Sequence, residues 1–295
     1  MSEALLRRYW RAQDPYDPDE LAACRHPRWS SDWPQTGERV PNNDADVKIH
    51  STYPGYPKHE QGHSATDESE AWVMSPSFTP IRVTTGGEVA VAEGRLDYPN
   101  IGVHHIAVLL ELKDGLIWRE TAYFAQDFDP PEWRADLADV IPEASAPARG
   151  ELDVRNEPVS GDAQANAAAL RSFFTAPLAA ASNDEARRTY QDGMRRIYAA
   201  DAEQLLVQSG ERFRGLERML ALVDRHPDFP KAGTLRRVTP VGNACVLEAR
   251  LEYDQGAFWE VMIVEFRDGR AIRSTEYYAA EEAAPEWRRE WVERM

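Results

Sequence analysis

The chain has 295 residues and a formal net charge of −16, with 50 acidic against 34 basic side chains. This charge argues against nucleic acid or an anionic membrane as a partner, because both would repel the protein at long range. The length predicts two domains, and a hydrophobic fraction of 42% supplies enough apolar surface for folded cores. Because no apolar run approaches the ~20 residues of a membrane span and the N-terminus lacks a signal-peptide core, we expect a cytoplasmic protein.

The first part of the chain is predicted to be helical. Apolar residues around Tyr9 and Trp10 have the spacing of an amphipathic helix, and a second helix is expected after Pro18. A short third helix over 43–51 ends at a proline-containing turn. Strands are expected at 89–98, 104–112 and 117–125, and Asp114-Gly115 predicts a tight hairpin between the last two.

The second part of the chain repeats this order. Helices are predicted around Phe173, over 184–204 and over 215–224, followed by strands with a hairpin at Asp268-Gly269. Three helices followed by an antiparallel sheet, twice over, predict an α+β architecture.

The two parts are copies of one another. Three blocks recur in the same order, at offsets of 155, 154 and 173 residues: 82–98 matches 237–253, 111–134 matches 265–288, and 36–40 matches 209–213. The change of offset predicts an insertion in copy one, which we place at 58–81. We therefore expect domains at 1–143 and 166–295, joined by a linker over 144–165 that is rich in Pro, Gly and charged residues.

Several of these segments carry a family resemblance. WPQTGERV at 33–40, the proline-rich turn after the third helix, the strand pair at 105–124 and PEWR at 131–134 resemble the nuclear-transport-factor-2-like superfamily, in its SnoaL-like branch. The resemblance implies two tandem cone-shaped, cystatin-like α+β barrels, each with three helices on a curved antiparallel sheet, forming a pseudo-dimer within one chain. Members of the superfamily include ketosteroid isomerases, polyketide cyclases, dehydratases, epoxide hydrolases and proteins without catalytic activity, so the fold alone leaves the function open.

The hairpin register decides which side chains share a face of the sheet. Counting outward from a two-residue Asp-Gly loop places His105 opposite Phe124 and Leu109 opposite Glu120. His105, Glu120, Trp118 and Phe124 are then expected on one face. Which face lines a pocket stays open at this point.

Differences between the copies indicate candidate catalytic residues in copy one. His50, His105 and Glu120 stand where copy two has Val223, Trp259 and Ser274. Imidazoles at otherwise apolar positions suit a general acid or base in a hydrophobic cavity, although a lone buried histidine is more often a hydrogen-bonded core residue. We therefore take His105, His50 and Glu120 as catalytic candidates. The expected pocket walls and substrate contacts are Trp33, Tyr53, Trp72, Trp118 and Tyr123.

Copy two also carries acidic residues within its predicted strands. Glu260 is expected opposite Tyr277, and Glu276 on the other face. Burial would raise the pKa of such a carboxyl and allow an acid-base pair with tyrosine, whereas a solvated edge strand would leave it an ordinary surface group. Glu38 and Glu211 occur in both copies, which favours a structural role such as pairing with a neighbouring arginine.

The insertion contains a motif that resembles a zinc site. His59-Glu60-Gln61-Gly62-His63 matches H-E-x-x-H, which binds zinc only when both histidines lie on one face of a helix. Prolines before the motif and a glycine within it argue against such a helix. We therefore predict that 58–81 is a loop or lid and expect no metal, with a metal-dependent hydrolase as the less favoured alternative.

These observations predict a small-molecule-binding protein. The chemistry that fits a copy one pocket is cofactor-independent proton transfer, as in an isomerase, cyclase, dehydratase or hydrolase, with no cofactor and a small apolar or carbonyl-containing molecule as the partner. The alternative is a non-catalytic binding or assembly scaffold. No nucleic acid or membrane partner is expected, and a homo-oligomer is possible.

Overall fold

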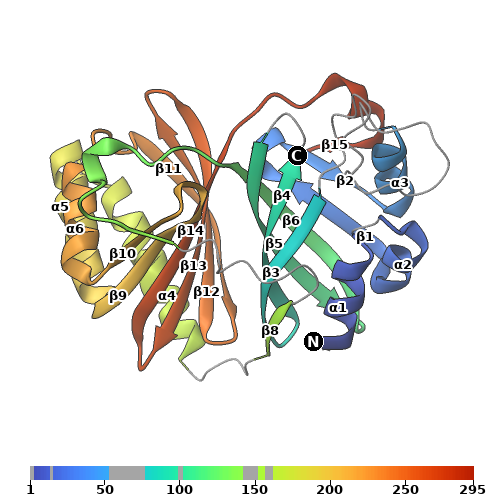
Figure 1. The fold of residues 1–295 in the computed structure, drawn as a ribbon, viewed down its shortest axis with the longest axis horizontal. Coiled ribbons are helices and arrows are strands. Elements are labelled where there is room, and N and C mark those ends of the chain that lie inside the picture. The colour runs from blue at the N-terminus through green and yellow to red at the C-terminus, as the bar shows by residue number, and fades with distance from the viewer. Residues whose placement is uncertain (1–2, 14–15, 53–76, 99–101, 142–151, 157–161) are drawn as a thin grey trace. The chain divides into compact units, whose positions relative to one another are not determined.

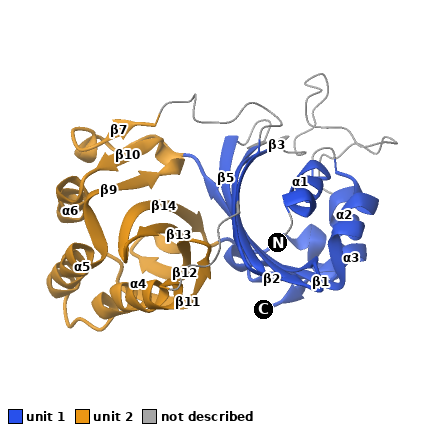
Figure 2. Ribbon diagram, turned by 90° about the horizontal axis from the view of Figure 1, so that it is seen from below, with its two compact units in different colours: residues 1–127, 146–156, 282–295 blue, residues 128–145, 157–281 orange. Residues whose placement is uncertain are grey.

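The computed structural model describes residues 3–13, 16–52, 77–98, 102–141, 152–156 and 162–295. Tertiary contacts divide the chain into two compact units. Unit 1 contains residues 1–127, 146–156 and 282–295, and unit 2 contains residues 128–145 and 157–281 (Figure 2). Each unit combines helices with one sheet, which confirms the predicted α+β class (Figure 1).

Unit 1 opens with the three predicted helices, α1 (Glu3–Arg11), α2 (Pro18–Cys24) and α3 (Asn43–Ser51). Its strands are β1 (Arg25–Trp33), β2 (Glu38–Val40), β3 (Ser77–Gly86), β4 (Val89–Tyr98), β5 (Gly102–Lys113), β6 (Leu116–Gln126), β8 (Asp153–Asn156) and β15 (Glu293–Arg294). They lie in the order β15-β2-β1-β6-β5-β4-β3-β8. Figure 2 shows this sheet curving around the helices, so that one face of the sheet and the apolar sides of the helices form a common core.

Unit 2 repeats the arrangement with helices α4 (Ala163–Leu178), α5 (Asn183–Ile197) and α6 (Leu216–Arg225). Its strands are β7 (Asp139–Val140), β9 (Tyr198–Leu206), β10 (Glu211–Arg214), β11 (Ala232–Val241), β12 (Ala244–Tyr253), β13 (Gly256–Arg267) and β14 (Arg270–Ala280). The sheet order is β11-β12-β13-β14-β9-β10-β7. The copies therefore share one topology in their helices and main strands.

The sheets are mixed, whereas the sequence predicted antiparallel ones. β1 runs parallel to β6, and β9 runs parallel to β14. The predicted helix over 184–204 ends at Ile197, because from Tyr198 the backbone is extended and pairs with β14. A strand directly after a helix, without a hairpin signal, leaves little trace in the sequence.

Local capping explains where the helices begin. The Asp17 side chain accepts a hydrogen bond from the Glu20 amide, with Pro18 in the first turn of α2. Asn42 caps α3 in the same way, through the Ala45 amide. Such caps satisfy amides that have no partner within the helix, and each contributes about 1 kcal/mol.

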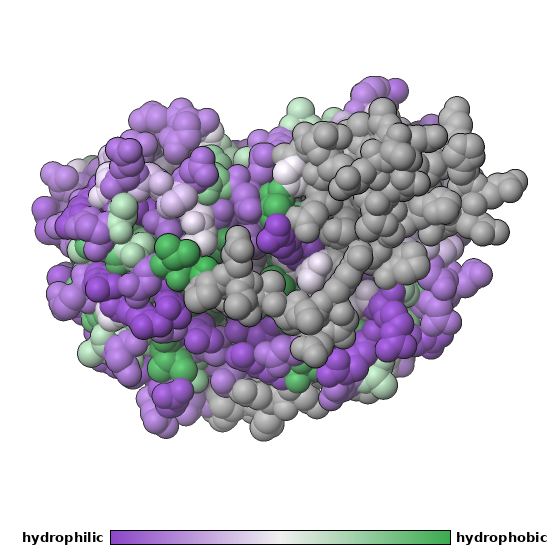
Figure 3. Space-filling view, viewed as in Figure 1, coloured by the Kyte–Doolittle hydropathy of each residue, from purple (hydrophilic) through white to green (hydrophobic). Residues whose placement is uncertain are grey.

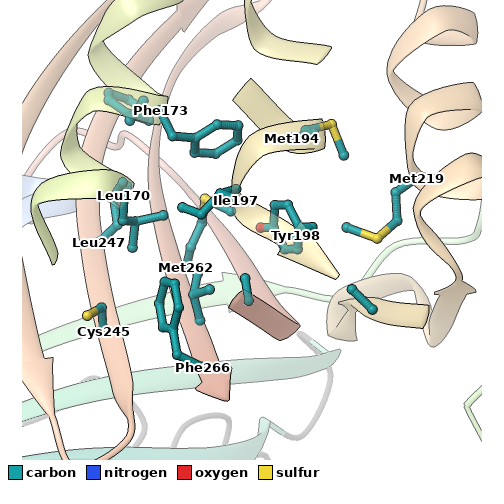
Figure 4. Packing of buried hydrophobic residues seen from close by; sticks show 14 of the residues in the cluster. Leu170, Phe173, Met194, Ile197, Tyr198, Met219, Cys245, Leu247, Met262 and Phe266 are labelled. Atoms are coloured by element: carbon teal, nitrogen blue, oxygen red, sulfur yellow. The ribbon is translucent and has the colours of Figure 1, made fainter. Parts of the chain in front are cut away.

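Apolar side chains of the helices and the sheet form the unit 2 core, shown in Figure 4. Leu170 and Phe173 from α4 and Met194 from α5 lie over Leu247 and Met262 of the sheet (Figure 4). Burying each such side chain contributes about 1.5–3 kcal/mol. The face of the molecule in Figure 3 is mostly hydrophilic in its described part, with apolar residues in small groups. None of the helices in the described ranges is long and apolar enough to cross a membrane.

The Asp-Gly hairpins are confirmed, but the predicted register was wrong by one residue. Asp114 and Gly115 both have positive φ, at 53° and 79°, as a type I′ turn requires. Lys113 pairs with Leu116, but Glu111 pairs with Arg119, so Trp118 is the extra residue of a β-bulge. Copy two has the same bulge at Ile272, between the pairs Phe266 with Ala271 and Glu265 with Arg273. Beyond each bulge, the cross-strand partner of a residue lies one position further along the chain than predicted. Residues that we expected on one face of the sheet therefore lie on opposite faces.

The final segment of each copy packs into the unit formed mainly by the other copy. In unit 2, β7 pairs with β10, and Arg134 of the first PEWR motif forms an ion pair of 2.6 Å with Glu211. In unit 1, β15 pairs with β2, and Arg288 of the second PEWR motif forms an ion pair with Glu38. Glu38 and Glu211 thus each pair with a PEWR arginine. We had expected each to pair with the arginine next to it in the sequence. The boundaries at 143 and 166 follow the repeat along the chain and stay a prediction.

The predicted insertion and the predicted linker each overlap a strand. β3 begins at Ser77, inside the range 58–81, and pairs with β4 as β11 pairs with β12. β8, within the predicted linker, pairs in parallel with β3. Residues 53–76, with the H-E-x-x-H sequence and the body of the predicted lid, lie outside the described residues.

Candidate functional site

Unit 2 contains a cavity of about 290 Å³ between its helices and the end of its sheet. Aromatic rings from α4, α5, the segment after α6 and the strands line much of it, namely Phe174, Tyr190, Phe229, Tyr253, Phe258 and Tyr278. Leu222 and Val223 of α6 and Leu251 of β12 add aliphatic surface. A cavity of this size and lining suits a small, mostly apolar ligand.

Polar side chains meet at one part of this lining. The Tyr278 hydroxyl lies 3.0 Å from Glu260 Oε1 and 2.9 Å from Glu276 Oε2. The Gln204 side-chain amide donates to both oxygens of Glu276, at 3.0 and 2.9 Å, and the Ser274 hydroxyl donates to Glu276 Oε1 at 2.9 Å. Glu260 and Glu276 are 5% and 2% exposed, so both carboxyls are held out of bulk water.

This burial changes the protonation of both acids. Burial, and then repulsion from Glu276, raise the pKa of Glu260 to about 8. Burial also raises the pKa of Glu276, but hydrogen bonds from Gln204, Ser274 and Tyr278 oppose the shift by favouring its ionised form. Burial therefore favours a proton on Glu260, whereas the hydrogen bonds to Glu276 favour its ionised form.

The bulge in β14 brings the two acids together. Glu260 pairs with Tyr278, and Met262 pairs with Glu276, so both acids and Tyr278 lie on one face of the sheet. We had expected Glu260 opposite Tyr277 and Glu276 on the other face, and both expectations were wrong for the same reason as in copy one. The sequence did indicate the two acids, since they interrupt apolar strands, but it gave no sign of Gln204 or Tyr278.

The end of copy one completes the cavity lining. Phe128 and Arg134 belong to the segment 128–145 and line the same cavity. The Arg134 guanidinium is bound to Glu211, with Nε 3.0 Å from both carboxylate oxygens. Its charge also lowers the pKa of Glu276, as one of the smaller contributions. Arg134 therefore stabilises unit 2 through a buried ion pair while it faces the site.

In unit 1, Glu120 belongs to a different buried cluster. It accepts hydrogen bonds from the hydroxyls of Tyr9 and Ser31, the second at 3.3 Å. Arg25 donates to Asp46 at 2.7 Å and contacts the Tyr9 hydroxyl at 3.4 Å. Burial raises the pKa of Glu120, and the positive charge of Arg25 opposes this shift.

His50 lies at the edge of this cluster. Its Nδ1 is 2.9 Å from the Asp46 carbonyl oxygen, and its ring stacks on Tyr16 at a centroid distance of 4.0 Å. The His50 side chain is 36% exposed. Burial opposes ionisation of Asp46, but His50, Arg25 and the Tyr16 hydroxyl outweigh it and lower its pKa.

His105 lies on the opposite face of the sheet from Glu120. It pairs with Ala125, whereas Glu120 pairs with Leu110 on the face that joins the helix core. His105 Nε2 contacts Asp127 at 2.7 Å. The expected catalytic pairing of His105 with Glu120 is therefore wrong in its geometry, because the bulge at Trp118 changes which residues share a face. The separate catalytic roles of His50, His105 and Glu120 stay predictions.

The expected wall residues of copy one are dispersed. The Arg288 guanidinium lies 4.6 Å from the Trp33 ring, so Trp33 contacts the C-terminal segment. Trp118, in the bulge, lies 4.0 Å from the Arg119 guanidinium, and Tyr123 is fully buried on the face of His105. Tyr53 and Trp72 lie outside the described residues.

Known proteins provide an independent comparison. No family model and no curated protein matches the chain. An NTF-2-like protein of unknown function from Burkholderia xenovorans is 30% identical over 46% of this chain and 99% of its own, with a TM-score of 0.40. A protein assigned as a ketosteroid isomerase from Kribbella flavida is 22% identical over 45% of this chain and 92% of its own, with a TM-score of 0.37. One assigned as a SnoaL-like polyketide cyclase from a Jannaschia species is 17% identical over 43% of this chain and 97% of its own, with a TM-score of 0.35.

Each match spans less than half of this chain and more than nine tenths of the solved protein. The identity to the Burkholderia protein extends over nearly all of that protein, and both units have the fold that the resemblance implied. The chain belongs to the NTF2-like superfamily, and it contains two tandem copies of the fold.

Proposed function

We propose that this protein binds a small, mostly apolar molecule in the unit 2 cavity and transfers a proton on it, with Glu260 and Glu276 as the acid-base pair. The reaction would be an isomerisation, cyclisation, dehydration or water addition of the cofactor-independent type. Ketosteroid isomerases and polyketide cyclases belong to the superfamily that the sequence resembles, which is in keeping with this class of chemistry.

The observation that carries the proposal is the contact of one tyrosine hydroxyl with two buried carboxyls. Tyr278 lies at hydrogen-bond distance from both Glu260 and Glu276. A hydroxyl has one proton to donate, so it can donate to one carboxylate and must accept from the other carboxyl. The contacts are all satisfied only when one acid is protonated and the other is ionised. Such a pair offers a proton donor and a proton acceptor at once.

The surroundings assign a role to each acid. Glu276 receives donors from Gln204 and Ser274 and is the ionised member, which suits a general base. Glu260 has a pKa raised to about 8 and is the protonated member, which suits a general acid near neutral pH. The apolar walls strengthen both roles, because charges interact more strongly where water is excluded.

Deuterium exchange tests the proposal without knowledge of the natural substrate. Small cyclic ketones in deuterium oxide should exchange protons next to the carbonyl faster with the protein than without it, as measured by proton NMR. Glu276→Gln should reduce the rate by about 10²–10⁴-fold, the usual contribution of a positioned base. Glu252→Gln is the matched control, because Glu252 is an exposed acid on β12. Equal rates for the wild type and Glu276→Gln would contradict the proposal.

A structural role for copy one is the second candidate function. It is favoured by the buried polar group formed by Tyr9, Arg25, Ser31, Asp46 and Glu120, which we call the Arg25 cluster. Arg25 pairs with Asp46, and Glu120 accepts from Tyr9 and Ser31. Buried polar groups with this many partners stabilise one packing arrangement and do not need a ligand. In this proposal unit 1 is the scaffold and unit 2 binds the ligand.

A further inference from the structure

The polar part of the unit 2 cavity contains a buried hydrogen-bond acceptor without a partner. Glu260 and Glu276 both line it, and so does Gln204, which is 7% exposed. The Gln204 amide nitrogen donates to Glu276, which fixes the orientation of the amide. Its Oε1 atom is buried and has no hydrogen-bond partner within the described residues. An acceptor left in this state costs about 1–3 kcal/mol unless a ligand donates to it.

Unit 1 shows how this fold neutralises such acids internally. Arg25 pairs with Ile117 of β6, and Tyr198 pairs with Ala271 of β14, so Arg25 and Tyr198 occupy equivalent positions. By the same offset, Asp46 of α3 corresponds to Met219 of α6. Unit 2 thus has two buried acids at other positions, those of Ile106 and Ala122 in unit 1, and a phenol where unit 1 has its guanidinium.

The cations around the unit 2 site are already engaged. Arg134 is the one arginine or lysine among the described residues of the lining, and it is ion-paired with Glu211. His226 also lines the cavity, and burial lowers its pKa, which favours the neutral ring. A bound cation would therefore meet, at Glu276, a carboxylate that is not ion-paired with any described residue of the lining.

The walls also suit a cation with an apolar substituent. The rings of Tyr190, Tyr253 and Tyr278 line the cavity together with the two acids. Aromatic faces attract cations that have lost part of their hydration. Phe174, Phe229 and Phe258 extend the apolar surface.

We propose that the molecule bound in this cavity carries a protonated amine, which donates to Glu276 and to Gln204 Oε1 while its apolar part lies against the phenylalanine rings. The amine takes the place of the internal cation that unit 1 supplies with Arg25. An anionic ligand would be repelled by Glu276, and a neutral one would leave the carboxylate of Glu276 without a cation. This inference rests on the proposed function in that it uses the same cavity.

Binding of an amine is expected to release a proton near neutral pH. The charged and titratable groups that face Glu260 are Glu276 and Tyr278 on β14, Tyr198 on β9, Tyr190 on α5, Tyr253 on β12, Asp228 and His226 after α6, and Arg134. A ligand cation favours the ionised form of Glu260, so its affinity should increase with pH up to about 8. For one released proton the increase is at most about tenfold per pH unit.

The test compares 2-phenylethylamine with its neutral analogue 2-phenylethanol, using the full chain, calorimetry and ligand-observed NMR. The amine should bind at least about tenfold more tightly at pH 7, with proton release seen as a buffer-dependent enthalpy. Glu276→Gln and Gln204→Leu should reduce the affinity for the amine by a larger factor than the affinity for the alcohol, whereas Glu252→Gln should change neither. Circular dichroism checks that each variant is folded.

Equal or tighter binding of the alcohol to the wild type would overturn the inference, and so would the absence of amine binding at millimolar concentration. These outcomes leave the proposed function standing if ketone deuterium exchange still depends on Glu276. Conversely, tight amine binding without any deuterium exchange would support the inference and contradict proton transfer as the function.

Discussion

Both units bury acidic side chains between the helices and the sheet, but in unit 1 an arginine binds one of these acids directly, whereas Glu260 and Glu276 of unit 2 form no ion pair with any described residue. In unit 1, the Arg25 guanidinium binds Asp46 at 2.7 Å and lies 3.7 Å from the Trp29 ring. In unit 2, Glu260 and Glu276 share the Tyr278 hydroxyl beside a cavity of about 290 Å³. The difference teaches that a direct arginine partner helps to keep a buried acid ionised, as Arg25 does for Asp46, whereas both unit 2 acids have raised pKa values.

The largest effect is expected from removing that arginine. Arg25→Met leaves Asp46 and Glu120 buried without their cation and should lower the free energy of unfolding by about 3–5 kcal/mol. Tyr198→Phe, at the equivalent position of unit 2, is the control and should cost about 1 kcal/mol or less. Urea denaturation measures both. Similar losses for the two variants would remove the distinction between the units.

The end segment of each copy, which packs into the unit formed mainly by the other copy, should contribute somewhat less to stability. Arg134→Met leaves Glu211 buried without its partner and should cost about 3 kcal/mol, with tighter amine binding in the cavity, because a positive charge that faces the site is lost. Arg288→Met breaks the matching pair with Glu38 and should cost a similar amount without affecting binding in the unit 2 cavity. Thermal unfolding and probe titration distinguish the two variants. Unchanged binding in Arg134→Met would show that the segment serves only stability.

The unit 2 acids should destabilise the fold at alkaline pH. The pKa of Glu260 is raised from 4.5 to about 8, so between these values the folded state binds more protons than the unfolded state and stability falls as pH rises. Glu260→Gln removes this dependence and should raise the free energy of unfolding by up to about 4 kcal/mol at pH 8, with no gain near pH 4. Melting temperatures across this range measure the effect. A gain that is the same at every pH would refute the assignment of a shifted acid.

The smallest effects are expected at the copy one histidines. His105→Ala removes a partly exposed contact with Asp127 and should change stability by less than about 1 kcal/mol. His50→Ala removes a contact at the edge of the Arg25 cluster and should cost about 1 kcal/mol. Neither variant should alter deuterium exchange or probe binding, both measured by NMR. Loss of exchange in either variant would place the working site in copy one, as the sequence first suggested.

The two copies differ most in how their buried acids are arranged, and sequence comparison was least informative about that arrangement. Their helices, hairpins and PEWR motifs were predictable, because apolar spacing, Asp-Gly turns and repeated blocks are local signals. The acids of unit 2 were also visible, as charges within apolar strands. Their shared contact with Tyr278 was not predictable, because it depends on a β-bulge at Ile272 and no turn residue in the sequence indicates that bulge.

The sequence by itself determined the duplication, the α+β class and the superfamily, since these rest on periodicity and on blocks that recur within the chain. Tertiary structure alone decided the strand pairing, the unit to which each end segment belongs, and the face on which each side chain lies. A single extra residue in a strand reverses every face beyond it, because side chains alternate with a period of two. For this reason Glu120 and His105 lie on opposite faces, while Glu260 and Glu276 lie on the same face and line one cavity.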